Sequence, residues 1–291
     1  MGSSRWVEVS CVVALMMVVQ PAFADDAAAR TAATKVMLEV QRKAFVASDH
    51  KAFAATLAPG AVTSFNGDKP STDLTLWDGS MIIDGATIAA TQIGWAGTWG
   101  WVGVEIRIKA VLIAASVEAG ARPSTETYHL LELVVPDGAG VKAAAVVLLP
   151  TKADKDLGYF DYAAELVPLT SPTPLIALLG SPTALAKALD EDPATSVLGT
   201  SANDRGLGAA AAKKLVASWS KLVLQPVTAK DAGDESLYET VEQRIGDATI
   251  AWTKVRMKVS GHNHWTVLAG FSIARATPTG PRPVALMYSA H

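Results

Sequence analysis

The chain has 291 residues, of which 50% are hydrophobic and 18% are charged, and its formal net charge is -3. This length suits one large domain or two of ordinary size. The near-neutral charge argues against a protein that binds nucleic acid by neutralising phosphates. The high apolar content excludes a disordered chain, so we expect a globular protein with an extensive core.

Residues 1–24 have the pattern of a secretory signal peptide. Arg5 precedes an apolar run over residues 9–19, and an Ala-Phe-Ala sequence ending at Ala24 follows it. A basic start, a short apolar stretch and an Ala-x-Ala site are the parts of such a peptide. A membrane anchor is the alternative, but a run of about 11 residues is too short for a bilayer that needs about 20. We therefore expect cleavage after Ala24, export to a bacterial periplasm or beyond, and no transmembrane segment in the mature chain.

The single cysteine, Cys11, lies inside this segment. The mature chain would therefore contain no thiol, which excludes disulfides, thiolate catalysis and cysteine-based metal sites. The sequence also contains no phosphate-binding loop and no dinucleotide-binding fingerprint. We expect no cofactor.

The mature chain begins with a predicted helix over residues 27–48. Met37, Val40, Ala44 and Phe45 recur at helical spacing. This spacing predicts that the four residues form the buried face of the helix.

A second, shorter helix is predicted directly afterwards. Ser48 and Asp49 are favourable N-cap residues, and the helix is expected to continue to Leu57, before Pro59 and Gly60. The segment that follows is rich in turn-forming residues.

Three strands are predicted in the rest of the first half. Apolar and charged residues alternate over residues 102–109, and two more strand-like runs cover residues 128–135 and 141–149. The Pro-Asp-Gly-Ala-Gly sequence at residues 136–140 predicts a hairpin turn between the last two.

Charged residues on the strand over residues 102–109 share one face. These are Glu105, Arg107 and Lys109. We expect a solvated face with ion pairs. Contact with an anionic ligand and pairing across joined sheets are the alternatives.

The second half repeats the order of helices followed by strands. Ser181 and Pro182 predict the start of a helix that runs through Leu189. A longer helix is expected from about residue 208 to residue 222, and strands are expected near residues 248–259, 265–275 and 283–289.

Two local matches between the halves indicate a duplication. Residues 48–57 resemble residues 181–189, and residues 101–108 resemble residues 252–259. In both pairs the aromatic, apolar and basic positions coincide. Together with the shared order of elements, these matches favour two tandem repeats. We place the domains at residues 25–155 and 156–291.

One stretch resembles a known family. Residues 198–219, a glycine-containing loop followed by an alanine-rich helix, resemble the middle of a SnoaL-like domain of the nuclear transport factor 2-like (NTF2-like) superfamily, and residues 247–256 and 284–289 resemble its following strands. The resemblance implies an α+β fold with two tandem cone-shaped NTF2-like domains. Each would be a curved antiparallel sheet packed on helices, with a pocket at its open end, and the two would form a pseudo-dimer within one chain. The superfamily contains isomerases, dehydratases, cyclases and many non-enzymes, so the resemblance does not fix an activity.

Tryptophans are the first candidates for a ligand site. Trp95, Trp99 and Trp101 lie close together in the sequence, and Trp252 occupies the position that matches Trp101. Such residues can wall a pocket for a planar or apolar ligand. The alternative is that they fill a core otherwise built from alanine.

His129 and Glu132 are the candidates for catalysis. Alternation along the strand over residues 128–135 places them on opposite faces, so they cannot form one acid–base pair. Either could act alone as a general base in a cavity, with a pKa shifted by burial. The alternative is that one faces solvent and the other is hydrogen-bonded in the core.

His262 and His264 are the candidates for a metal site. At a spacing of two residues they would share one face of a strand and could supply two ligands. Because no third ligand lies nearby in the sequence, a solvated hairpin turn is the alternative, and we expect no metal.

These observations favour an exported, non-catalytic protein that binds an apolar small molecule or another protein. No nucleic acid is expected as a partner. The alternative is an isomerase, dehydratase or cyclase that uses one buried His or Asp/Glu in a cone. A cavity in which His129 or Glu132 meets a second polar group would favour the enzyme.

Overall fold

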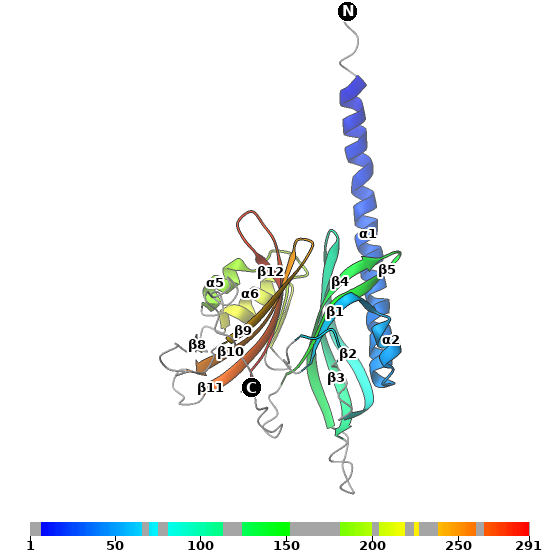
Figure 1. Ribbon diagram of the computed structural model, residues 1–291. Helices are drawn as coiled ribbons and strands as arrows, with labels where there is room; N and C mark the ends of the chain where they lie inside the picture. Colours follow the sequence, from blue (N-terminus) through cyan, green and yellow to red (C-terminus); the bar gives the residue numbers. More distant parts are fainter. Residues whose placement is uncertain are drawn as a thin grey trace, which may run out of the picture.

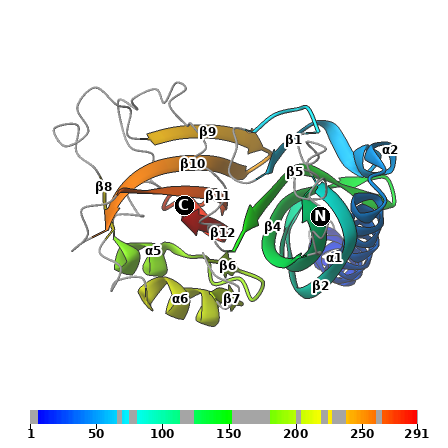
Figure 2. The ribbon, with the colours of Figure 1, turned by 90° about the horizontal axis from the view of Figure 1, so that it is seen from below.

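The computed structural model describes residues 7–65, 70–74, 81–112, 124–151, 181–199, 204–218, 224–226, 238–259 and 265–290. These residues form helices and two predominantly antiparallel sheets, so the fold class is α+β. The two sheets lie in the middle of the molecule, and the helices lie on the sides of the sheets that face away from each other (Figures 1 and 2). None of the described helices is both long and apolar enough to span a membrane. The predicted boundary between residues 155 and 156 lies outside the described residues.

The first half begins with two helices, α1 (Val7–Val46) and α2 (His50–Ala54). Helix α1 continues without a break across the predicted cleavage site after Ala24. Helix α2 begins where the sequence predicts, because the side chain of Asp49 accepts a hydrogen bond of 2.9 Å from the backbone N–H of Ala52.

The buried face of α1 differs from the prediction at one position. Met37, Ala44 and Phe45 are buried as expected, but Val40 is 40% exposed and Gln41 is only 4% exposed. Gln41 follows Met37 by one helical turn and precedes Ala44 and Phe45 by another, so it lies on the same stripe. A polar side chain therefore occupies a core position.

The first sheet has five strands in the order β1-β5-β4-β3-β2. They are β1 (Leu57–Phe65), β2 (Met81–Ala96), β3 (Trp99–Leu112), β4 (Ser124–Asp137) and β5 (Gly140–Pro150). The three predicted strands correspond to β3, β4 and β5. The hairpin turn between β4 and β5 is confirmed, with Gly138 at φ 59°.

The strands β1 and β2 lie where the sequence predicts the end of a helix and turns. Both are edge strands, and both are irregular. The register shifts once along β1, which accommodates Pro59 and Gly60, and twice along β2. Because a bulge reverses the alternation of faces, neither strand shows a regular period of two, and an edge strand tolerates a proline.

The second half contains two helices and seven strands among its described residues. They are α5 (Pro182–Ala188), β6 (Ser196–Leu198), β7 (Arg205–Leu207), α6 (Ala209–Ser218), β8 (Leu224–Pro226), β9 (Tyr238–Ile245), β10 (Ala248–Val259), β11 (Trp265–Arg275) and β12 (Arg282–Ala290). The predicted helix at residues 181–189 is α5, with Ser181 as its N-cap, and the three predicted strands are β10, β11 and β12. Helix α6 lies within the predicted range of residues 208–222, of which residues 219–222 are outside the described part.

Five strands of each sheet share one topology, and the second sheet has β7 and β8 in addition. In each, four successive strands form an antiparallel meander, β2 to β5 in the first sheet and β9 to β12 in the second. An earlier strand then lies parallel beside the last one, β1 beside β5 and β6 beside β12. This shared topology supports the duplication that the sequence matches indicate.

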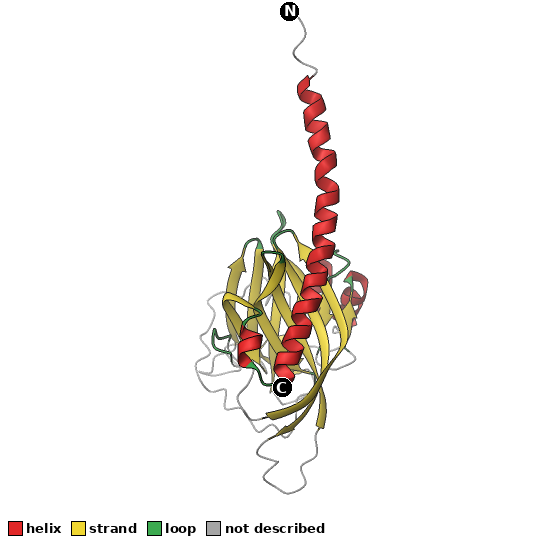
Figure 3. Ribbon diagram, turned by 90° about the vertical axis from the view of Figure 1, so that its right-hand side faces the viewer, coloured by secondary structure: helices red, strands yellow, loops and turns green. Residues whose placement is uncertain are grey.

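The two sheets pack against each other through an apolar core. We call the face of the first sheet that contacts the second sheet its outer face, and the face that contacts α1 and α2 its inner face. The inter-sheet core includes Trp99, Trp101, Leu131, Leu133 and Val147 from the first sheet and Ile250, Trp252, Phe271, Ile273 and Met287 from the second. Across the inner face, α1 lies over the strands (Figure 3) and packs against them through residues such as Leu38 and Phe45.

Candidate functional site

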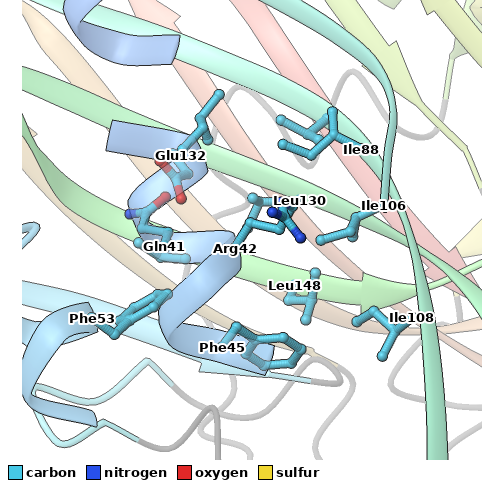
Figure 4. A pocket seen from close by; sticks show the side chains of 13 residues that line it. Gln41, Arg42, Phe45, Phe53, Ile88, Ile106, Ile108, Leu130, Glu132 and Leu148 are labelled. Carbon is cyan, nitrogen blue, oxygen red and sulfur yellow. The ribbon is translucent and has the colours of Figure 1, made fainter. Parts of the chain in front are cut away.

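A pocket lies between α1, α2 and the inner face of the first sheet (Figure 4). Its volume is about 40 Å³, which is room for about three water molecules. The unfilled space is about 470 Å³ when the open mouth is included. Most of the lining residues are apolar: Leu38, Gln41, Arg42, Phe45, Phe53, Ile88, Val104, Ile106, Ile108, Leu130, Glu132, Val146 and Leu148.

Strand alternation determines which side chains enter this pocket. On β4, Leu130 and Glu132 face α1, while Leu131 and Leu133 between and beyond them enter the inter-sheet core. The sequence of this strand is apolar on both faces because both faces are buried. Glu132 is the one acidic residue in that apolar run, and because it lies on the face toward α1, its side chain enters the pocket.

The carboxyl of Glu132 is fully buried. Its exposed fraction is 0%, and neither oxygen has a hydrogen-bond partner among the described residues. Because burial disfavours the charged form, desolvation raises the pKa of Glu132 to about 8. The carboxyl is therefore mainly protonated at neutral pH and can donate a hydrogen bond.

Gln41 is the polar neighbour of this carboxyl. Its side chain points from α1 toward Glu132 (Figure 4), and its amide offsets a part of the rise in the pKa of Glu132. Neither polar atom of the Gln41 amide has a hydrogen bond of good geometry within the described ranges. A buried polar group without a partner lowers the stability of the folded state by about 1–3 kcal/mol. Two such groups in one pocket, Glu132 and Gln41, therefore require an explanation.

Arg42 forms a wall of the pocket, and its guanidinium already has partners. Nε and Nη2 donate to the carboxylate of Glu39 at 2.7 and 2.6 Å, and Nη1 donates to the carbonyl of Ala86 at 3.0 Å. These contacts link α1 to β2 and lower the pKa of Glu39. The hydrogen-bonding groups that a ligand could engage in the pocket are therefore those of Glu132 and Gln41.

His129 lies on the opposite face of the sheet from Glu132, so the structure does not bring the two together. The ring is 1% exposed, and its Nδ1 is 3.0 Å from the carbonyl oxygen of Gly199. Desolvation lowers the pKa of His129, which keeps the ring neutral with Nδ1–H donating to that carbonyl. His129 therefore contributes to the contact between the two halves and does not reach the pocket.

Glu105 also joins the two halves. It is 2% exposed and forms an ion pair with Arg205 on β7, while Arg107 lies 3.6 Å from its other oxygen. The expectation of a solvated face thus holds for Arg107 and Lys109, which are exposed, and is wrong for Glu105. The second sheet covers that end of the strand face, which the sequence of β3 alone does not reveal.

The candidate tryptophans lie outside the pocket lining. Trp99 and Trp101 are 0% exposed and Trp252 is 2% exposed, and all three belong to the inter-sheet core. The indole N–H of Trp101 donates to the carbonyl of Ala194 at 3.0 Å. Trp95 is half-buried against the inner-face core.

His262 and His264, the candidates for a metal site, lie outside the described residues. Within the described ranges, no group of three or more His, Cys, Asp or Glu side chains is arranged to hold a metal ion.

Gln41 is the site residue that the sequence interpretation overlooked. It interrupts the apolar stripe of α1 midway between Met37 and Phe45, while Val40 beside it offers an apolar alternative for the same stripe. A polar residue at the centre of an otherwise apolar stripe is the sequence signal that could have identified Gln41 as a site residue.

Comparisons with known proteins found similarity at the level of solved structures. No family model matches the chain, and no curated protein matches it. A ketosteroid isomerase-like protein from Erwinia carotovora atroseptica is 15% identical, with a TM-score of 0.34, and the match covers 41% of this chain and 94% of that one. An NTF2-like protein from Cytophaga hutchinsonii is 13% identical, with a TM-score of 0.34 over 40% of this chain and 94% of that one. An NTF2-like protein of unknown function in nutrient uptake from Rhodospirillum rubrum is 19% identical, with a TM-score of 0.34 over 40% of this chain and 96% of that one.

Proposed function

We propose that the first half of the chain binds a small, mostly apolar molecule whose polar end accepts a hydrogen bond from the protonated carboxyl of Glu132. The observation that carries this proposal is a fully buried carboxyl at the wall of an apolar pocket, with no hydrogen-bond partner in the part of the chain that the structure describes. Ligand pockets typically combine apolar walls with a few polar groups that fix orientation. A ketone or ether oxygen suits Glu132, and the amide of Gln41 can donate to the same oxygen.

We further infer that both halves are NTF2-like domains that form a pseudo-dimer within one chain. The shared strand topology and the apolar core between the sheets support this inference. Export through a signal peptide over residues 1–24 is part of the same proposal, supported by the sequence pattern alone. The mass of the mature protein, which should begin at Asp25, tests the export.

A matched pair of probes tests the ligand proposal. 2-Acetylnaphthalene and 2-isopropenylnaphthalene have nearly the same shape, because a CH2 group replaces the ketone oxygen, but only the first carries a hydrogen-bond acceptor. The naphthalene ring of either probe would extend into the open mouth of the pocket. At pH 6 we expect the wild-type protein to prefer the ketone by about fivefold, because one net hydrogen bond contributes about 1 kcal/mol. Affinities are measured by the change in probe fluorescence on titration with protein.

The substitution Glu132→Leu is the matched variant, because leucine is similar in size to glutamate and has no polar atom. We expect the variant to prefer the ketone by clearly less than the wild type, because only the amide of Gln41 can then donate to its oxygen. In the wild type the preference should decline above pH 8, where Glu132 ionises and repels the ketone oxygen. An undiminished preference in Glu132→Leu, or wild-type protein that binds neither probe, contradicts the proposal.

A proton-transfer enzyme is the second candidate function, and the raised pKa of Glu132 favours it. A general base or acid is most effective when its pKa lies near the working pH, and a value of about 8 meets this condition. 5-Nitrobenzisoxazole reports such activity, because its ring opens once a base removes a single proton from carbon. We expect the rate to rise with pH through about 8 and Glu132→Gln to lose this rise. Equal rates for the two proteins would exclude Glu132 as the base.

A further inference from the structure

The two sheets can be aligned residue by residue through their strand pairing. One row of paired residues crosses the first sheet, one residue per strand: Val62, Ala145, Leu133 and Trp101. The corresponding row crosses the second sheet: Leu198, Met287, Phe271 and Trp252. All eight belong to the inter-sheet core or pack against it. Because strand order, pairing and buried face agree at every position, this alignment matches Trp101 with Trp252.

The neighbouring row carries the pocket carboxyl in the first sheet. Glu132 directly precedes Leu133 on β4 and pairs with Val146 on β5, and both line the pocket. In the second sheet Gly270 directly precedes Phe271 on β11 and pairs with Tyr288 on β12. Gly270 is therefore the counterpart of Glu132, and Tyr288 is the counterpart of Val146.

The ring of Tyr288 occupies the space above Gly270. A Cβ atom built on Gly270 would lie 2.1 Å from Cε1 and 2.2 Å from Cδ1 of Tyr288, which is far inside van der Waals contact. Tyr288 is 3% exposed, so the packing around its ring is tight. No side chain can stand at the position of the pocket carboxyl in the second sheet while the ring keeps this place.

We propose that the second half has lost the ligand site, because Tyr288 fills the space that a ligand and Glu132 share in the first half. Each chain therefore binds one ligand, and the second half acts as the structural partner of the first. This inference rests on the proposed function of the first half. Replacing the carboxyl by a glycine covered by a ring removes the cost of burying an acid without a partner. The second half still covers Trp99 and Trp101 on the outer face of the first sheet.

Binding stoichiometry tests this inference on the full chain. Equilibrium dialysis with saturating 2-acetylnaphthalene should give one molecule bound per wild-type chain. The double substitution Glu132→Gly and Val146→Tyr copies the arrangement of the second half into the first, and we expect it to reduce binding to none. Two molecules bound per wild-type chain would overturn the inference and leave the proposed function standing, whereas none bound would overturn the proposed function itself.

The substitution Tyr288→Val copies Val146 into the second half and should open a second site. We expect two molecules bound per chain, while the control Tyr288→Phe, which keeps the ring, should still bind one. If Tyr288→Val does not fold, as judged by its thermal melt, Tyr288→Leu removes the ring with a smaller loss of volume. A folded variant without the ring that still binds one molecule would show that Tyr288 does not close the site.

Discussion

At the scale of single residues, Glu132 makes the first half of this protein chemically distinctive. Its carboxyl is buried with no charged partner among the described residues, and the amide of Gln41 favours the ionised form too weakly to offset the desolvation. The folded state therefore keeps a proton that the unfolded chain releases above a pKa of about 4.5. This difference in proton binding makes the stability of the protein depend on pH.

The direction of that dependence follows from the raised pKa. Between pH 4.5 and about 8 the folded chain holds one proton more than the unfolded chain, so the free energy of unfolding should fall as the pH rises through this range. The full change is on the order of 5 kcal/mol, because each unit of pKa difference corresponds to about 1.4 kcal/mol. Glu132→Gln cannot ionise, and we expect it to lose this decline and to exceed the wild type in stability at pH 9.

Urea unfolding of both proteins at pH 5, 7 and 9 measures the effect. The difference between the two proteins isolates Glu132, since every other ionisable group is common to both. Two curves that run parallel across this range would mean that Glu132 is ionised in the folded state, contrary to its burial.

At the scale of secondary-structure elements, the regularity of the strand register and the presence of a capping residue decided which elements could be predicted from the sequence. The strands β10 and β11 and the cap of α2 follow from local patterns, because β10 and β11 pair without a register shift and the side chain of Asp49 caps α2. β2 could not be recognised, because its two register shifts interrupt the alternation of faces. The sequence prediction placed Val40 on the buried face of α1, where the structure places Gln41. Because of this error of one position, the sequence did not reveal Gln41 as the polar neighbour of Glu132.

At the scale of the whole molecule, the inter-sheet core links the two halves. A buried tryptophan removes about 150–250 Å² of surface from water, equivalent to about 4–6 kcal/mol at 25 cal/mol per Å². Trp99, Trp101 and Trp252 all lie in this core. Separation of the halves would expose them together with Leu131 and Leu133 of β4.

We therefore expect residues 25–155, expressed alone, to be less soluble than the full mature chain. Size-exclusion chromatography with light scattering should show aggregates or dimers of the isolated segment. Leu133→Lys places a charge on the exposed outer face, so it should improve the solubility of the segment while destabilising the full chain. Equal solubility, with a sharp independent melt for each half, would contradict the proposed pseudo-dimer.

The sequence by itself determined the alternation of the strands, the likeness of the two halves and the opposite orientations of His129 and Glu132, because these depend on neighbours along the chain. The tertiary structure decided which face of each strand meets which partner. It placed Trp101 between the sheets, Glu105 beside Arg205, and Gln41 opposite Glu132. Contacts between residues far apart in sequence depend on how sheets and helices pack, and no local pattern specifies them. The composition described a protein of near-neutral charge with an extensive core, and the fold shows that one carboxyl within this core faces an apolar pocket.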